Sequence, residues 1–301
     1  DNHKMSIHLE VKFEDEICDN LSRNGWLYEK GSAAKYNREL ALYPPDLIAW
    51  VKESQKKDWE TLEKKHKSKA EAVLLQRIRS QLNLAGTLDV LRYGVDVFGL
   101  KNIIKLTEFK PQLPANNEVI QRHKANRLRV IRQVKYSIYN ENCIDLVLFL
   151  NGIPVATVEL KTDNTQNIEK AIEQYKKDRI PNEPRKKPEP LLTFPSGALV
   201  HFAVSNKEVW MSTKLDGPRT IFLPFNRGSA PGEKDCGKGN PNTDGHKTEY
   251  LWKEIWEREN WLEIVARYFS TERNKKKKIE KILFPRYHQW RVTKRLQQEI
   301  L

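Results

Sequence analysis

Two acidic residues and one lysine stand out within an apolar stretch, CIDLVLFLNGIPVATVELKT, which spans residues 143–162. Asp145 lies inside the first apolar run, where an unpaired carboxylate is expensive to bury. Glu159 and Lys161 are two residues apart, and the alternation of a strand places them on one face. Two carboxylates and a backbone carbonyl suit Mg²⁺, which prefers oxygen ligands and retains several waters. A metal with a lysine beside it stabilises charge on a phosphate and lowers the pKa of a bound water.

The turn between the two apolar runs decides whether these side chains can meet. Asn151-Gly152 is a strong hairpin signal. A two-residue turn at these positions would make Asp145 point away from Glu159. A three-residue turn that begins at Leu150, with Gly152 in the left-handed conformation, would put Asp145 on the side of Glu159. The site therefore requires the longer turn or a nearby bulge, and we predict the longer turn.

The elements that position this site are strands in the middle of the chain and helices around them. Helical periodicity covers the start up to a stop at Gly25, and Asp46 is expected as the N-cap of a second helical region. Further helical segments are 46–84, 166–178 and 250–269. Strands are expected at 103–109, 127–138, 143–150, 153–161, 198–205, 208–214 and 219–224. This order predicts an α/β or α+β fold, with a mixed sheet flanked by helices.

Composition and charge restrict the partners of the chain. Its 301 residues include 53 Lys and Arg against 40 Asp and Glu, a formal net charge of +13, which favours a polyanion, nucleic acid first. No apolar run is long enough for a transmembrane helix, so no membrane partner is expected. The three cysteines are widely spaced, which excludes a disulfide framework and a CxxC zinc site. With no basic-then-apolar leader at the start, we predict a cytoplasmic protein.

The chemical constellation resembles the PD-(D/E)xK nuclease motif, with Asp145, Glu159 and Lys161 as its members and Ile144 where the motif name has Pro. Much more of the chain is similar to the N-terminal part of the restriction (R) subunit of Type I restriction–modification enzymes, most firmly over 127–301. The matching segments are FLNGIPVATVELKT, AIEQYKKDR, GALVHFAVSNKEVWMSTKL, TIFLPFNRG, GKGNP, YLWKEIW and FPRYHQWRVTKRL.

This resemblance implies a restriction-endonuclease-like nuclease domain at 1–249, with 46–84 as a helical scaffold insertion. A helical connector at 250–301 would lead into an ATP-dependent motor that is absent from this chain. The implied activity is Mg²⁺-dependent cleavage of double-stranded DNA, which follows ATP-driven translocation in the full-length protein. The implied partners are DNA and the modification (M) and specificity (S) subunits, and ATP is implied only for the full-length protein.

The resemblance also assigns roles to individual residues. It implies that Asp145 and Glu159 bind Mg²⁺, that the carbonyl of Leu160 is a further ligand, and that Lys161 supports the attacking water. Many nucleases of this class use a glutamate on their first helix. Glu14 matches that place best and Glu16 competes with it, although a glutamate early in a helix is also favoured by the helix dipole.

A second group of residues is expected to contact DNA. Gln174 matches the Gln of a Gln-x-x-x-Tyr element in relatives, whereas Asp178 occupies the place of its Tyr. Tyr175 beside it suits the core. The basic stretch 176–187 follows the candidate site directly and suits a phosphate-tracking loop, although a solvated loop has the same composition. The predicted DNA contacts are Gln174, Lys176, Lys177 and Arg179.

The remaining motifs concern nucleotide binding and the alternatives. Gln289, in RYHQW, matches a Gln that helps to recognise adenine in the family, but no GxxxxGK[ST] motif follows, so a complete ATPase site is absent. His201 is expected as a core histidine, and Lys275 to Lys278 as a solvated turn. One alternative function is a module that docks DNA or partner subunits without cutting. Another is a metal-dependent phosphodiester enzyme that acts on RNA or single strands.

Overall fold

The computed structural model describes residues 2–162, 167–228 and 239–300 of the chain. The chain forms two compact units. The first unit comprises Asp1–Leu21, Val158–Ile180 and Val200–Leu301, and the second comprises Ser22–Thr157 and Pro181–Leu199. The boundary predicted between residues 249 and 250 stays a prediction.

The central element is a six-stranded mixed sheet with the strand order β1-β2-β3-β4-β5-β6. The pairs β1–β2, β4–β5 and β5–β6 are antiparallel. The strands are β1 (Leu128–Lys135), β2 (Cys143–Leu150), β3 (Ile153–Leu160), β4 (Val200–Val204), β5 (Val209–Ser212) and β6 (Leu223–Pro224). The predicted fold, an α/β restriction-endonuclease-like sheet with flanking helices, is confirmed. The strand predicted at 103–109 is wrong, because Ile104 forms only an isolated bridge with Val95.

Strand β3 is buried along its whole length. All eight of its residues are buried, which is expected of a strand covered on both faces. Its apolar run continues the pattern of β2, so both strands read as near-continuous hydrophobic sequence. Glu159 is therefore a charged residue inside a buried strand.

The turn between β2 and β3 differs from the prediction. It has two residues, since β2 ends at Leu150 and β3 begins at Ile153. Asn151 and Gly152 have φ values of 49° and 79°, the two left-handed residues of a type I′ turn. A Cβ at position 152 would lie 2.5 Å from the carbonyl oxygen of Tyr43, so close approach as well as φ requires glycine. The predicted three-residue turn is therefore wrong.

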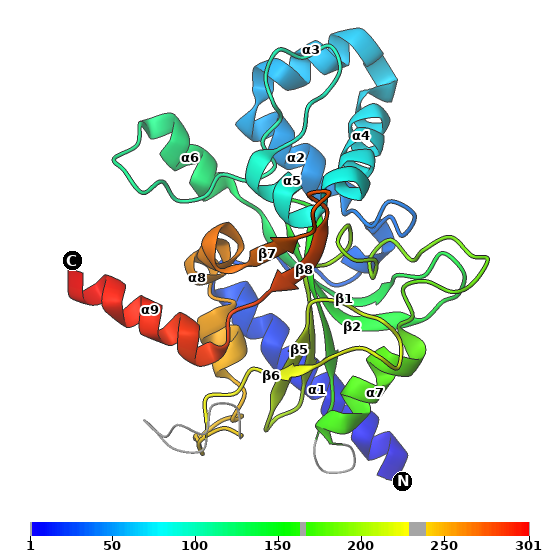
Figure 1. The fold of residues 1–301 in the computed structure, drawn as a ribbon, viewed down its shortest axis with the longest axis vertical. Coiled ribbons are helices and arrows are strands. Elements are labelled where there is room, and N and C mark those ends of the chain that lie inside the picture. Colours follow the sequence, from blue (N-terminus) through cyan, green and yellow to red (C-terminus); the bar gives the residue numbers. More distant parts are fainter. Residues whose placement is uncertain (1, 163–166, 229–238, 301) are drawn as a thin grey trace. The chain divides into compact units, whose positions relative to one another are not determined.

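The second unit contains the predicted helical region, in which α2, α3, α4 and α5 lie together (Figure 1). Asp46 is not the N-cap that the sequence suggested, because Pro44 and Pro45 already form the first helical turn and Tyr43 is the N-cap. The helical elements of this unit are η1 (Ser32–Lys35), α2 (Pro44–Ser54), α3 (Lys56–His66), η2 (Lys67–Lys69), α4 (Ala70–Ala85), α5 (Thr87–Tyr93) and α6 (Asn117–Ala125).

Asp46 instead binds two arginines of the same unit. Its Oδ2 accepts a hydrogen bond of 2.6 Å from Arg129 Nε, and its Oδ1 accepts bonds of 2.9 and 3.0 Å from Arg127 Nε and an Arg129 terminal nitrogen. Asp46 and Arg129 are 0% and 4% exposed. Burial alone would lower the pKa of Arg129, but the hydrogen bond and charge of Asp46 outweigh it and raise that pKa.

The first unit contains the helices at both ends of the chain. The helical periodicity predicted at the start, at 166–178 and at 250–269 is confirmed, apart from residue 166, which lies outside the described residues. The helical elements are α1 (Asn2–Arg23), α7 (Ile168–Asp178), η3 (Leu251–Ile255), α8 (Arg258–Glu263), η4 (Ile264–Tyr268) and α9 (Tyr287–Ile300). Between η4 and α9 lies a hairpin that the sequence did not reveal, made of β7 (Ser270–Arg273) and β8 (Ile279–Leu283).

None of the helices in the described part of the chain combines the length and the apolar character needed to cross a membrane.

Candidate active site

The candidate site begins with Glu159, the penultimate residue of β3. Its side chain is 0% exposed, and its Oε1 accepts a 2.8 Å hydrogen bond from Arg179 Nε. Arg179 follows the last residue of α7 and is itself 4% exposed. A buried carboxylate is tolerated when a cation and hydrogen bonds compensate it. Arg179 thus holds the charge of Glu159 within the interior of the first unit.

Lys161 directly follows β3. Its backbone N–H donates to the carbonyl of Val204, which fixes the chain beside β4. Its amine lies 3.6 Å from a carboxylate oxygen of Glu10 on α1, and the two side chains are 16% and 24% exposed. The lysine is therefore held by an acid of the first helix, in a partly solvated position that suits contact with a ligand.

Asp145 lies on β2 in the second unit, where it is half-buried and its Oδ1 accepts a 3.3 Å hydrogen bond from Gln133 Nε2. With a two-residue turn, convergence with Glu159 requires an irregularity farther along the two strands. Since Asp145 belongs to the second unit and Glu159 and Lys161 to the first, their convergence stays a prediction.

The donor types fit Mg²⁺. Asp145, Glu159 and the Leu160 carbonyl are hard oxygen ligands. Among the described residues, no cluster of three or more His, Cys, Asp or Glu side chains could hold a metal. Mg²⁺ binding stays a prediction.

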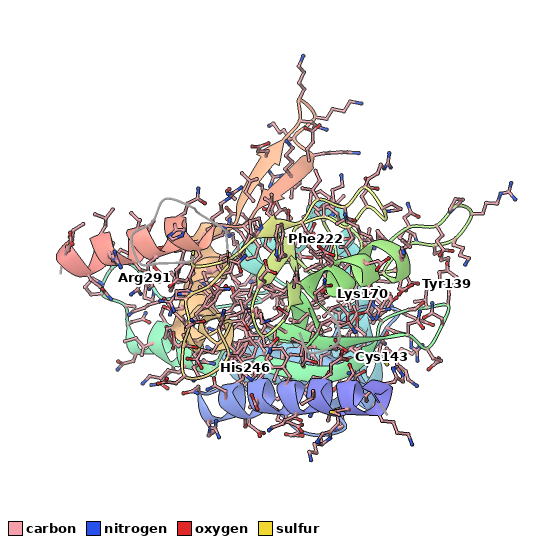
Figure 2. The ribbon with its side chains drawn as sticks, turned by 90° about the horizontal axis from the view of Figure 1, so that it is seen from below. Tyr139, Cys143, Lys170, Phe222, His246 and Arg291 are labelled. Atoms are coloured by element: carbon pink, nitrogen blue, oxygen red, sulfur yellow. The ribbon has the colours of Figure 1, made fainter. Side chains whose placement is uncertain are left out.

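The glutamates of α1 have distinct surroundings. Glu14, the predicted metal ligand, is 4% exposed. Glu16, its competitor, has a carboxylate oxygen 2.6 Å from Nε2 of His246. The ring of His246 also lies beside the ring of Phe13 on the same helix, and Figure 2 shows His246 next to α1. The sequence did not lead us to predict Glu10 as a site residue. Glu10 lies four residues before Glu14, so the helix places the two on the same face. That spacing was the available signal.

The predicted DNA contacts on and after α7 differ in exposure. Arg179, predicted as a DNA contact, is 4% exposed and forms an ion pair with Glu159, and its contact with DNA stays a prediction. Lys177 forms an ion pair with Glu173 on the solvent side of α7. Lys176 is half-buried. Binding of DNA by these two lysines stays a prediction.

Gln174 lies on α7 with a buried carbonyl oxygen that has no hydrogen-bond partner within the described ranges. Such an atom in a half-buried side chain suits a bound water or ligand group. Its neighbour Tyr175 is 0% exposed and its hydroxyl donates to the carbonyl of Phe202 at 2.9 Å. The core position expected for Tyr175 is confirmed, and the role of Gln174 stays a prediction.

His201 is a core residue, as predicted. It is 1% exposed on β4, and its ring lies 5.9 Å from that of Tyr175. Burial lowers the pKa of His201 from 6.5 to about 3, so the imidazole is neutral in the folded chain.

This histidine should make the chain less stable in acid. The unfolded state binds a proton near pH 6.5 whereas the folded state does not, so stability falls as pH decreases from there towards about 3. Between pH 7.5 and 5.0 we expect a loss of about 2 kcal/mol from this group. Urea unfolding at both pH values measures it, with His201→Gln as the reference. An identical pH dependence of the two proteins would contradict the prediction.

Gln289, the predicted adenine contact, lies in the first turn of α9. Its side-chain oxygen accepts a 3.0 Å hydrogen bond from the backbone N–H of Arg286, the residue before the helix. This is the Gln-to-N-cap half of a capping box. Gln289 is exposed and stabilises the helix start, and its binding of a nucleotide stays a prediction.

Comparison with known proteins identifies the family. Residues 45–220 match the family described as Type I restriction enzyme R protein N terminus (HSDR_N), which is more than half of the chain. The chain belongs to this family. The resemblance stated from the sequence is confirmed. No curated protein matches the chain.

The matched part of this R-protein domain contains the residues on which the candidate site depends. Asp145, Glu159, Lys161 and Arg179 all lie within 45–220, whereas Glu10 lies before it. Membership in a restriction-enzyme family implies DNA and the M and S subunits as partners. The family also suggests a nuclease.

Proposed function

We propose that this chain carries the nuclease of a Type I restriction enzyme R subunit, which cuts double-stranded DNA with Asp145, Glu159 and Lys161. The observation that most supports this is a fully buried carboxylate, Glu159, two residues before a lysine at the end of β3. Burying a carboxylate is unfavourable, and ionisable groups in such perturbed surroundings cluster at functional sites.

Asp145, Glu159 and the carbonyl of Leu160 would hold Mg²⁺, an ion that retains several waters. When bound, the ion supplies Lewis-acid stabilisation of a phosphate and a water of lowered pKa. Lys161 would donate a hydrogen bond to the phosphate and neutralise the charge that develops there. Its partial exposure beside Glu10 supports this role.

Two further residues of the first unit act on the proposed catalytic residues. Arg179 compensates the charge of Glu159, and Glu10 holds the amine of Lys161 near the end of β3. Neither needs to touch DNA for this purpose. Both are positioning residues in the proposed mechanism.

Cleavage in the full-length protein would follow ATP-driven DNA translocation, and ATP would bind to the motor of that protein. The specificity subunit would choose the DNA sequence, so the nuclease needs no base-reading element. Phosphate and metal contacts at the cut site are sufficient for such a division of labour. The chain would then act in the cytoplasm, where DNA and the partner subunits are present.

Replacing Asp145 by Ala should abolish cutting while DNA binding and ATP hydrolysis persist. The substitution removes one proposed metal ligand, and the loss of such transition-state stabilisation lowers the rate by about 10²–10³ or more. The assay uses the full-length R subunit assembled with its M and S subunits, duplex DNA, ATP and Mg²⁺. Omission of ATP tests whether cutting requires ATP, and replacement of Mg²⁺ by Ca²⁺ tests whether it requires Mg²⁺.

The outcomes separate the alternatives. A wild-type complex that translocates DNA but never cuts it would support the docking module instead. Faster digestion of RNA or single-stranded DNA than of duplex DNA would support a different phosphodiester enzyme. Cutting by Asp145→Ala at the wild-type rate would remove Asp145 from the catalytic set.

A further inference from the structure

The β7–β8 hairpin carries an unusual concentration of positive charge. Its connecting turn contains Lys275, Lys276, Lys277 and Lys278 in succession, and all four side chains are exposed. Side chains that end in nitrogen project from this hairpin in Figure 2. The repulsion between adjacent ammonium groups opposes such an arrangement in a folded protein.

The four lysines lack acidic partners among the described residues. Elsewhere on the same hairpin a lysine is paired, since Lys281 lies 3.9 Å from Glu272. The other basic stretch, after the candidate site, also has charges that are paired: Lys177 with Glu173 and Lys186 with Glu183. The tip of the hairpin therefore presents four consecutive exposed lysines without such ion pairs, whereas the basic stretch that the sequence favoured is paired in part.

The tip is also ordered by its own hydrogen bonds. The side-chain oxygen of Asn274 accepts bonds of 2.9 and 3.0 Å from the backbone N–H groups of Lys276 and Lys278. The backbone N–H of Lys277, which has a φ of 61°, donates to the Asn274 carbonyl at 2.9 Å. A fixed turn presents the lysines with less conformational entropy to lose on binding than a flexible tail would.

The base of the hairpin is held by the first unit. Thr213 donates a 2.6 Å hydrogen bond to the carbonyl of Ile282, whose side chain is 2% exposed. Phe284, the next residue after β8, packs among the rings of Phe225 and Phe269, with centroid distances of 5.2 and 5.1 Å. The charged tip thus extends from a hairpin base that is packed against other residues of the first unit.

We propose that the tip of the β7–β8 hairpin, Lys275–Lys278, binds the phosphate backbone of duplex DNA outside the cutting site. Unpaired lysines on an ordered ribbon suit phosphates, which they contact without reading bases. The choice of DNA among polyanions rests on the family and on the proposed function. Binding at the tip itself does not depend on cleavage.

Replacing the four lysines by Gln should weaken binding to a nonspecific 40-base-pair duplex about tenfold or more at 0.15 M salt. The slope of log affinity against log salt should become shallower by about one for each phosphate that the variant no longer binds. The 301-residue chain is titrated in EDTA, so cutting plays no part and failure of the proposed nuclease would leave this result unchanged.

Two control variants give the comparison. Replacing the four lysines by Arg keeps the charge and should retain binding. Replacing Lys56, Lys57, Lys64 and Lys69, which are exposed on α3 and η2, by Gln removes the same charge elsewhere and should have a much smaller effect. Thermal unfolding verifies that each variant folds. An unchanged affinity in the hairpin Gln variant, or an equal loss in both Gln variants, overturns the proposal.

Discussion

Replacing Glu159 by Leu should eliminate DNA cleavage and, in the same protein, destabilise the fold. Catalysis fails because the proposed metal loses a carboxylate ligand, with a rate loss of about 10³ or more. Stability falls because Arg179, 4% exposed, remains as a buried charge without its acid. Breaking a buried pair in this way costs about 3–5 kcal/mol. Cleavage by the assembled complex and urea unfolding of the chain measure the two effects.

The double variant Glu159→Leu/Arg179→Met separates these two roles. Removing both residues leaves neither charge of this ion pair without the other, so much of the stability should return. Cleavage should not return, because the carboxylate is still absent. Glu173→Gln is the matched control. It removes an acid that pairs with Lys177 on the solvent side of α7, and it should leave cleavage unchanged. A double variant that cuts DNA at the wild-type rate would show that Glu159 has only a structural role.

Replacing Asp46 by Ala should produce the largest loss of stability in the second unit. The substitution removes three hydrogen bonds to Arg127 and Arg129 and leaves Arg129 buried beside the ring of Tyr43. The expected decrease in the free energy of unfolding is about 3–5 kcal/mol. Urea unfolding of the chain, followed by tryptophan fluorescence and circular dichroism, measures this change.

Glu141→Ala provides the control for Asp46. Glu141 also binds two cations, Arg38 at 3.0 Å and Lys135 at 2.7 Å, and these hydrogen bonds lower its pKa to about 2. It is exposed, however, where ion pairs contribute little because water and salt screen them. A similar loss in both variants would contradict the importance assigned to burial of Asp46.

The sequence alone was sufficient to predict the secondary structure that arises from local periodicity. It predicted the strands around Glu159 and the helix that contains Tyr175, because burial on a sheet or a helix face requires apolar residues at regular spacing. The residue types at positions 159 and 161, with the segments around them, pointed to the candidate site and to the family. The family was thus recognisable from residue types and spacing, whereas the chemistry of the motif stays a prediction.

The wrong predictions concerned a contact between residues far apart in the chain and the conformation of one turn. The partners of Asp46 lie 81 and 83 residues later in the chain, so local reasoning made it an N-cap. The turn at Asn151-Gly152 was lengthened to bring Asp145 towards Glu159, against the intrinsic preference of Asn-Gly for a two-residue type I′ turn. Arg179, the partner of Glu159, lies 20 residues later in the chain and could not be found from spacing alone.

The ion pair between Glu10 and Lys161 has a practical consequence for work with shortened proteins. Trimming the amino end past α1 would leave the whole motif from Asp145 to Lys161 in place, yet it would delete the acid that holds the lysine. An inactive product of such trimming would report on the missing helix and not on the motif. Affinity tags for purification are therefore better attached with α1 left intact.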